Sequence, residues 1–325
     1  MQAVLEHTER ARQAETYIGP YRLVKHIKQG GMGSVYLGYY IYTKTYVAIK
    51  VFDSYATDLA MMYRERDITQ ALQHKHIVPC LDAGQYGRYH YMVMPYLEGG
   101  TLEGMLNESV LTLEEARIVL EQLTSALAYI HKLGILHRDI KPGNILFDRH
   151  GNLYLTDFGI ATWLGEKPLH NGHVMGTAHY IAPELFDGFA DERSEVYSVG
   201  ILLYELLTGS LPFDGPSDWK ICLQHREARP VAPSLLNPSI PRPIEHVILR
   251  ALEKDPRHRY QTVEDLLQAF QTALEAPSFL GHLSTKWQST RQKLRNRLSP
   301  ETSSWLPAGE LAPSEISSPK RDLPY

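Results

Sequence analysis

The hydrophobic pattern changes once along this 325-residue chain, and that change limits the folds available to it. Between Tyr21 and Tyr96, short runs rich in β-branched and aromatic residues alternate with glycine-rich turns, which predicts strands. Residues 57–72 differ and fit a helix. Beyond Glu98, helical periodicity replaces the strand pattern. The chain is therefore predicted to be α+β, with a small β-rich lobe carrying one helix and a larger α-helical lobe.

The clearest helix is predicted to begin at Thr112, which can form a capping box with Glu115, and to end at Gly134. Its apolar residues recur at steps of three and four on one face: Ala116, Leu120, Leu123, Leu127 and Ile130. Further helices are predicted near residues 193–208, 217–226, 241–253 and 262–274. Two lobes joined in this way leave a cleft, a favoured position for a ligand.

Composition narrows the class of protein. Hydrophobic residues make up 43% of the chain, enough to form a core, and a net charge of −4 does not favour binding to nucleic acid. Cys80 and Cys222 lie far apart in sequence, which fits a reducing compartment. No apolar run reaches the ~18 residues of a membrane span, and the N-terminus does not resemble a signal peptide. We expect a soluble, cytoplasmic protein, although truncation of a longer parent stays open.

The two ends differ in composition from the rest of the chain. Residues 1–20 form a polar leader, and residues 275–325 are first basic and then rich in Ser and Pro, which predicts disorder. Residues 282–298 contain five Lys or Arg residues and no acidic residue. A solvated linker is the favoured interpretation of this segment, and a helix that contacts a membrane surface is the alternative.

Two short segments carry the chemistry. Residues 137–144 read His-Arg-Asp-Ile-Lys-Pro-Gly-Asn, and Asp157-Phe158-Gly159 begins 13 residues after Asn144. An acid in such a loop can orient a hydroxyl group, while Asn and Asp oxygens are hard ligands for Mg²⁺. Phosphoryl transfer from ATP needs these parts and little covalent chemistry from the protein. A polar turn without function does not explain their joint spacing.

Three further motifs extend this pattern: the glycine-rich run 29–35, Val47-Ala48-Ile49-Lys50, and Ala182-Pro183-Glu184. Together the motifs resemble the serine/threonine protein kinases, most closely the bacterial ones. The resemblance covers residues 21–274, with an N-lobe over 21–95 and a C-lobe over 96–274. It implies the bilobal kinase fold, ATP and Mg²⁺ (or Mn²⁺) as cofactors, protein substrates, and self-association as in some relatives.

The resemblance also assigns roles to single residues. Asp139 would orient the acceptor hydroxyl and take its proton, assisted by Lys141 and Thr177. Lys50 would contact the nucleotide phosphates and pair with Glu65. The metal ligands would be Asn144 and Asp157. The remaining contacts to ATP would come from Gly30, Gly31, Met32, Gly33, Val35, Ala48, Met94, Tyr96, Leu97 and Leu146.

The chain departs from the family pattern in two places. Lys28 occupies the position of the first glycine in the glycine-rich loop, and we expect a modest effect on nucleotide affinity. Glu195 replaces an aspartate that hydrogen-bonds the catalytic-loop backbone, and we expect this bond to survive with a shifted backbone. Two family contacts are predicted unchanged: packing of Phe158 near His137, and an ion pair between Glu184 and Arg259.

The activation loop lacks Ser, Thr and Tyr from residue 163 to residue 176. The sequence therefore predicts a kinase that does not need phosphorylation in mid-loop, with an acid such as Glu166 replacing the phosphate beside Arg138. His170 and His173 could bind a metal, but their spacing alone favours ordinary loop residues.

Two functions remain after these arguments. A protein serine/threonine kinase is the predicted function, because all the charged or polar catalytic positions are intact. The alternative is a catalytically weak, nucleotide-binding signalling scaffold, which the two departures and the loop without phosphorylation sites keep open.

Overall fold

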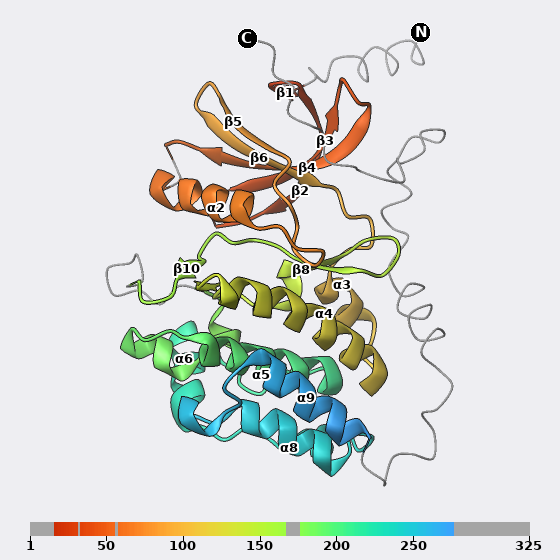
Figure 1. Ribbon diagram of the computed structural model, residues 1–325, viewed down its shortest axis with the longest axis vertical. Coiled ribbons are helices and arrows are strands. Elements are labelled where there is room, and N and C mark those ends of the chain that lie inside the picture. Colours follow the sequence, from red (N-terminus) through yellow and green to blue (C-terminus); the bar gives the residue numbers. More distant parts are fainter. Residues whose placement is uncertain (1–15, 32, 56–57, 167–175, 276–325) are drawn as a thin grey trace. The chain divides into compact units, whose positions relative to one another are not determined.

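The computed structural model describes residues 16–31, 33–55, 58–166 and 176–275 (Figure 1). These form two compact units. One contains the described residues up to Leu59 together with Cys80–Tyr96, and the other contains Ala60–Pro79 together with the described residues from Leu97 onward. The predicted tail, including the basic segment 282–298, lies outside the described residues.

The first unit is a six-stranded antiparallel sheet with strand order β1-β2-β3-β4-β6-β5. Its strands are β1 Thr16–Ile18, β2 Tyr21–Gln29, β3 Ser34–Tyr40, β4 Thr45–Asp53, β5 Asp82–Tyr86 and β6 Tyr89–Pro95. Strand β1 lies in the predicted leader, the first fifteen residues of which lie outside the described residues.

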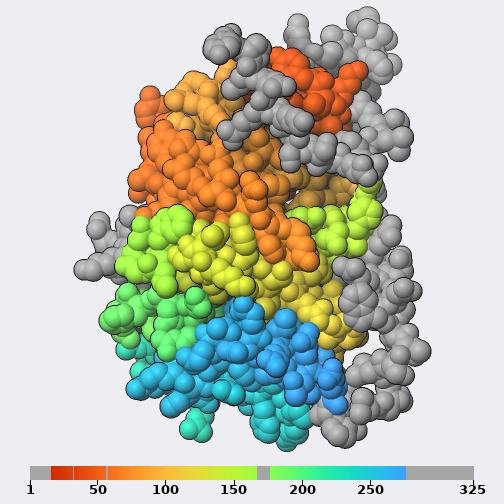
Figure 2. All heavy atoms as spheres, in the orientation of Figure 1, coloured from red at the N-terminus to blue at the C-terminus, as the bar shows by residue number. Residues whose placement is uncertain are grey.

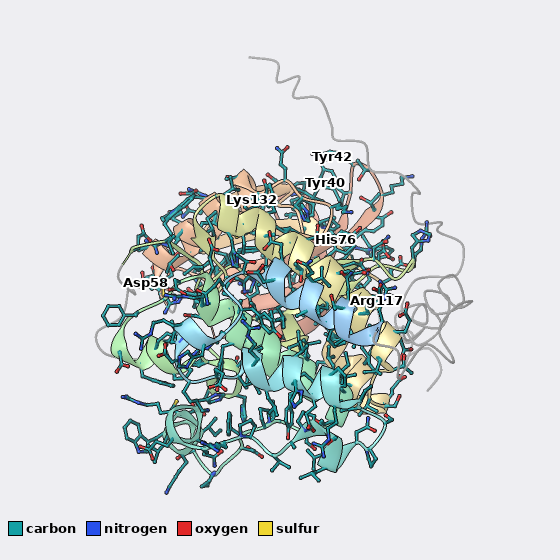
Figure 3. All side chains as sticks on the ribbon, turned by 60° about the horizontal axis from the view of Figure 1, so that its bottom comes forward. Tyr40, Tyr42, Asp58, His76, Arg117 and Lys132 are labelled. Carbon is teal, nitrogen blue, oxygen red and sulfur yellow. The ribbon has the colours of Figure 1, made fainter. Side chains whose placement is uncertain are left out.

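Tyrosines and β-branched residues build the core of this sheet. Val47, Ile49 and Val93 are buried together with Tyr21, whose ring stacks on Tyr40 at 4.9 Å. The Tyr21 hydroxyl donates to Asp82 at 2.8 Å, so the phenol group is not left unpaired on burial. Tyr40, labelled in Figure 3, is partly buried and packs against this cluster. The β-branched and aromatic pattern of the sequence thus becomes the buried face of the sheet.

The second unit is mainly helical. Its helices are α2 Leu59–Ala71, α3 Leu102–Glu108, α4 Leu113–Lys132, α5 Glu192–Thr208, α6 Asp218–Glu227, α7 Pro233–Leu236, α8 Arg242–Ala251 and α9 Val263–Leu274. Its short strands are β7 Ile135–Leu136, β8 Ile145–Phe147, β9 Leu153–Leu155 and β10 Thr162–Trp163. Short 3₁₀ turns η1 Pro142–Asn144, η2 Ala178–Tyr180, η3 Pro183–Asp187 and η4 Pro256–His258 occur in the connections.

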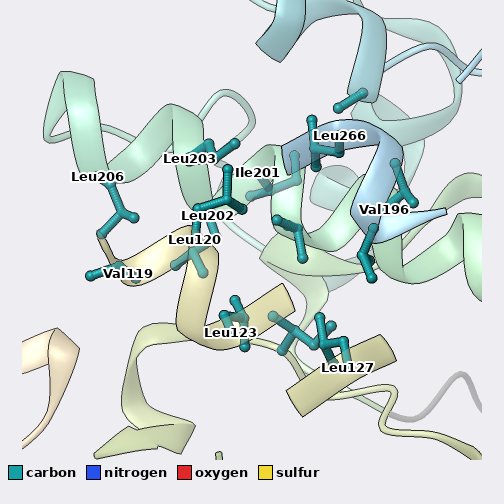
Figure 4. Close-up of a cluster of buried hydrophobic side chains, with 14 of the residues drawn as sticks. Val119, Leu120, Leu123, Leu127, Val196, Ile201, Leu202, Leu203, Leu206 and Leu266 are labelled. Atoms are coloured by element: carbon teal, nitrogen blue, oxygen red, sulfur yellow. The ribbon is translucent and has the colours of Figure 1, made fainter. Parts of the chain in front are cut away.

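Helix α4 organises the core of this unit. The predicted capping box between Thr112 and Glu115 is present, and the whole predicted apolar face is buried. Leu123 and Leu127 meet side chains of α5 and α9 in one cluster (Figure 4). Figure 2 shows α9, in blue, at the surface of this unit, while its Val263, Leu266 and Phe270 are buried in the core. The helices predicted at 193–208, 217–226, 241–253 and 262–274 end within about two residues of the observed ends.

No helix in the described ranges has both the length and the hydrophobicity needed to cross a membrane.

Candidate active site

The catalytic loop follows strand β7 and has an unusual backbone. Arg138 has a φ of 68° and Asp157 has a φ of 67°, the left-handed conformation that costs a non-glycine residue about 1–2 kcal/mol. Such residues persist only where the surrounding structure fixes them. Arg138 directly precedes the predicted base Asp139, and Asp157 is itself a predicted metal ligand.

The Asp139 carboxylate gathers three of the predicted residues. Its Oδ1 accepts hydrogen bonds from the backbone N–H and the hydroxyl of Thr177, at 3.2 and 3.0 Å. Its Oδ2 lies 2.6 Å from Nζ of Lys141 and accepts from Nδ2 of Asn144 at 2.8 Å. Lys141 also donates to the Thr177 hydroxyl at 2.7 Å. One carboxylate is thus held between a cation, a hydroxyl and an amide.

Asn144 and Asp157 are connected through the backbone. The N–H of Thr156, the residue before Asp157, donates to the carbonyl of Asn144 at 3.0 Å. Nδ2 of Asn144 donates to the backbone carbonyl of Asp139 at 2.9 Å as well as to its carboxylate. Because both bonds involve the amide nitrogen, Oδ1 of Asn144 is the atom that could ligate a cation.

Phe158 packs as predicted. Its ring meets that of His137 edge-on at 4.7 Å, and both side chains are buried. His137 Nε2 hydrogen-bonds the Thr156 carbonyl at 3.0 Å, which links the catalytic loop to the segment that carries Asp157. The ring pair therefore stabilises the relative position of the two loops.

Glu195 retains the bond to the catalytic loop. Its Oε1 accepts from the backbone N–H of Arg138 at 2.8 Å, so the predicted survival of this bond is confirmed. Its Oε2 lies 2.5 Å from Nε2 of His131, a contact that we did not predict. A signal for it was available, since His131 lies four residues after Leu127 and thus on the buried face of α4.

The predicted ion pair between Glu184 and Arg259 is confirmed. The two guanidinium Nη atoms donate to the two carboxylate oxygens at 2.7 and 2.8 Å. Ser194 donates to the same carboxylate at 2.7 Å. The Arg259 side chain has no exposed surface, so this pair anchors the end of the activation segment to the core.

The prediction that Glu166 pairs with Arg138 is wrong. The Glu166 carboxylate lies 2.8 Å from Nη1 of Arg64, on α2, and accepts the backbone N–H of Trp163 at 3.3 Å. Burial lowers the pKa of Arg138, and the charge of Arg64 adds to this effect, although Glu195 opposes it. Glu166 thus compensates Arg64, whose charge acts unfavourably on that of Arg138. His170 and His173 lie outside the described residues.

The glycine-rich loop lies in the first unit. The N–H of Gly30 donates to the carbonyl of Gly33 at 2.8 Å. A Cβ on Gly33 would lie 2.4 Å from the Val51 carbonyl oxygen, so only glycine fits there. Lys28, near the end of β2, is exposed and follows a register shift against β3, but its φ is not positive, so its backbone does not require glycine. Met32 lies outside the described residues, and Gly31 follows Gly30 in the turn.

The other predicted nucleotide residues are distributed over both units. Val35 lies opposite Lys50 across β3 and β4, and Ala48 lies opposite Met94 across β4 and β6. Tyr96 ends the first unit. Leu97 and Leu146 belong to the second unit, the latter on β8.

Lys50 and Glu65 are both buried, at 8% and 3% exposure. Lys50 lies on β4 in the first unit, with Nζ 5.4 Å from the centre of the Phe52 ring, and Glu65 lies on α2 in the second. Their mutual pairing stays a prediction.

A family model described as protein kinase domain matches residues 21–271. The chain belongs to the protein kinase family. The bilobal kinase fold, with a β-sheet N-lobe and a helical C-lobe, is therefore shown, and this family uses ATP and a divalent metal.

Several bacterial serine/threonine-protein kinases are similar to this chain. It is 42% identical over 266 residues to serine/threonine-protein kinase PrkC of Bacillus subtilis, a match that covers 79% of this chain and 41% of the relative. It is 38% identical over 255 residues to the probable kinase PknB of Lactococcus lactis, with 76% and 41% covered. PknL of Mycobacterium tuberculosis is 36% identical over 269 residues, with 80% and 67% covered. The kinase thus spans about two fifths of the length of PrkC and PknB.

Proposed function

We propose that this kinase transfers the γ-phosphoryl group of ATP to serine and threonine hydroxyls of protein substrates. The carrying observation is the Asp139 carboxylate, which is bonded to Thr177 and Asn144 and lies 2.6 Å from Lys141. A carboxylate fixed at two oxygens can orient an acceptor hydroxyl and take its proton, while the adjacent ammonium compensates negative charge on the transferred group.

The donors near Asp139 suit a hard divalent cation. We assign Asn144 Oδ1 and the Asp157 carboxylate as its ligands, because amide and carboxylate oxygens are what Mg²⁺ prefers. Mn²⁺ is the alternative, since it accepts the same ligands. When bound, the ion supplies charge neutralisation for the phosphates. The protein itself orients the hydroxyl at Asp139 and holds Thr177 against that carboxylate.

The nucleotide residues are proposed by analogy with the family and by local geometry. Gly30 closes the turn through its N–H to the Gly33 carbonyl, and backbone N–H groups of residues 31–33 would bind phosphate oxygens. Lys50, positioned by Glu65, would bind the α- and β-phosphates. The base would contact Val35, Ala48, Met94, Tyr96, Leu97 and Leu146.

Exchange of Asp139 for asparagine tests the proposal. With Mg·[γ-³²P]ATP and a generic protein acceptor, Asp139→Asn should lose about 10²–10⁴-fold of the rate if Asp139 is the base. Asp218→Asn, the same chemical change on the exposed first turn of α6, is the matched control and should retain full activity. Nucleotide binding with no transfer above background in the wild type would instead support the scaffold function.

Three expectations concern the setting of the kinase. We place it in the cytoplasm, where ATP is available and where Cys80 and Cys222 would stay the free thiols they are in the structure. Self-association stays a prediction. Membrane-surface contact through residues 282–298 also stays a prediction, on residues outside those that the structure describes.

A further inference from the structure

An open hollow lies on the second unit where helices α8 and α9 pack against each other (Figure 1). Its surface is mostly apolar, and its volume is about 530 Å³. The residues that line it are Pro243, Asp265, Gln268, Ala269, Thr272 and Ala273. Volumes of about 300–1,000 Å³ are typical of sites that bury a ligand. The hollow therefore has room for several side chains of a partner, and it shares no residue with the proposed active site.

The sequence that follows α9 contains a segment suited to this hollow. Helix α9 ends at Leu274 with Glu275 as its C-terminal cap, and Pro277 follows two residues later. Because proline cannot continue a helix, the chain is expected to change direction there. The next large apolar residues recur at steps of three and four: Phe279, Leu280, Leu283 and Trp287. In a helix these side chains would share one face.

The charges of α9 and of the following segment are complementary. Helix α9 contains Glu264 and Asp265, both exposed, and no Lys, Arg or His. Residues 282–298 contain five Lys or Arg residues, beginning with Lys286, and no acidic residue. Opposite charges on two surfaces steer their association and fix its register, and the effect weakens as salt is added. The surface beside the hollow therefore favours a basic partner, and such a partner follows directly in the chain.

We propose that residues 279–287 turn back after Pro277 and dock as a short helix in the hollow between α8 and α9. Gly281 and the shortness of the segment make this helix unstable alone, since isolated helices below ~12–15 residues are marginal in water. Helix formation and docking therefore occur together, as in other helix-in-groove contacts. Lys286 is then bound by the kinase itself and not by an anionic membrane. The docking goes beyond the proposed function and needs no phosphoryl transfer.

Chain length sets the register of the docked segment. Phe279 lies four residues after Glu275, so an extended connection reaches about 13–14 Å, which is enough to bring its ring to Ala273. From Ala273 back to Asp265, α9 rises about 12 Å. From Phe279 onward to Lys286, a docked helix rises about 10 Å. Antiparallel to α9, the segment thus places Lys286 beside the acids at the start of that helix.

Hydrogen–deuterium exchange of the full chain tests the docking, because a docked helix protects its amides and a free segment does not. The first four N–H groups of a helix have no partner within it, so the informative amides are those of residues 283–287. We expect them to exchange at least about tenfold more slowly than those of residues 300–318, the reference segment of the same chain. The protection should decrease between about 50 mM and about 500 mM salt.

Two pairs of variants locate the contact. Gln268→Arg adds a long cation to an exposed wall of the hollow and should abolish the protection, whereas Gln70→Arg, the same change on exposed α2, should leave it. Phe279→Gln should also abolish it, and Trp305→Gln, outside the docked segment, should not. Wild-type exchange equal to that of the reference segment, or protection that survives Gln268→Arg, would overturn the proposal. So would protection that appears only at high protein concentration, which indicates a second copy, or only with anionic vesicles, which indicates a membrane.

A cross-link in the wild type needs no variant. A carbodiimide joins an ammonium group to a carboxylate only where the two are in contact, so mass spectrometry should find Lys286 linked to Glu264 or Asp265 within one chain. Links from Lys286 to other carboxylates alone, or only between two chains, would overturn the docking. Absence of phosphoryl transfer in the wild type would refute the proposed function and leave both measurements intact.

Discussion

Loss of the Glu184 carboxylate should destabilise the kinase more than any surface substitution. Arg259 is fully buried and uses all five of its N–H donors. Two bonds go to Glu184, and three go to the backbone carbonyls of Glu253, Arg193 and Lys254, at 2.6, 3.0 and 3.0 Å. Removing Glu184 therefore leaves a buried cation with only dipoles as partners. Breaking such a pair costs about 3–5 kcal/mol.

This cost can be measured as a shift in melting temperature. For a domain of this size, 1 kcal/mol corresponds to about 2–4 °C, so Glu184→Ala should lower Tm by about 6–20 °C. The three carbonyls still solvate the guanidinium, which places the expected value in the lower half of this range. Glu184→Gln keeps the shape and one acceptor, and should lose less.

A double-mutant cycle separates the pair from its surroundings. Arg259→Met keeps much of the side-chain volume beside the Tyr197 ring. The loss of unfolding free energy in this single variant includes the three backbone carbonyls that lose the Arg259 donors. If the ion pair is the main interaction, Glu184→Gln combined with Arg259→Met should be less destabilised than the sum, by about 1–3 kcal/mol. Urea unfolding at pH 7 gives the four free energies of unfolding, for the wild type, the two single variants and the double variant. A coupling energy below about 0.5 kcal/mol would refute the reasoning.

Three further changes have defined outcomes. Thr177→Val removes the hydroxyl that bonds the Asp139 carboxylate, and kcat should fall about 10–100-fold in a steady-state assay, whereas retention of full activity would contradict the site geometry. Burial and the charge of Arg259 lower the pKa of Lys254 to about 8, and its Nζ has no hydrogen-bond partner among the described residues. Lys254→Met should therefore stabilise the fold by about 1–3 kcal/mol at pH 7. The gain should shrink between pH 8 and 10.5, where folded wild type loses the proton and the unfolded chain keeps it; a constant difference in Tm would count against this. Glu166→Gln breaks only a partly exposed ion pair with Arg64, so the free energy of unfolding, measured by thermal denaturation, should fall by less than about 1 kcal/mol.

The sequence predicted the structure best where a local pattern of residues is compatible with a single kind of element. The capping box at Thr112 and the apolar stripe of α4 depend on residues three and four apart, and both appear as predicted. The positions of Asp139, Lys141 and Asn144 within one loop restrict how far apart these side chains can lie. Thr177 also bonds the Asp139 carboxylate, although it lies 38 residues away in sequence. Spacing alone could not predict this contact, and the prediction came from the family motif.

Contacts between charged residues distant in sequence were less predictable. The sequence favoured Arg138 as the partner of Glu166, whereas the structure pairs Glu166 with Arg64 on α2. His131 near the end of α4 resembles an ordinary histidine at a helix C-terminus, and its partner Glu195 is 64 residues away. In both cases the choice of partner depends on how the charged side chains are buried in the folded chain. The sequence shows burial only indirectly, through the pattern of apolar residues around them.

The first turn of α5 explains why Glu195 can differ from the family residue without loss of its bond. Three consecutive residues there bind different parts of the second unit: Arg193 through its carbonyl to Arg259, Ser194 to Glu184, and Glu195 to the catalytic loop and α4. Because the first two contacts fix the helix end independently, the additional methylene of Glu195 has to be absorbed by its own side chain. The Glu195 carboxylate is held at both oxygens, one by the Arg138 N–H and the other by His131, so the longer side chain still makes the contact with the catalytic-loop backbone.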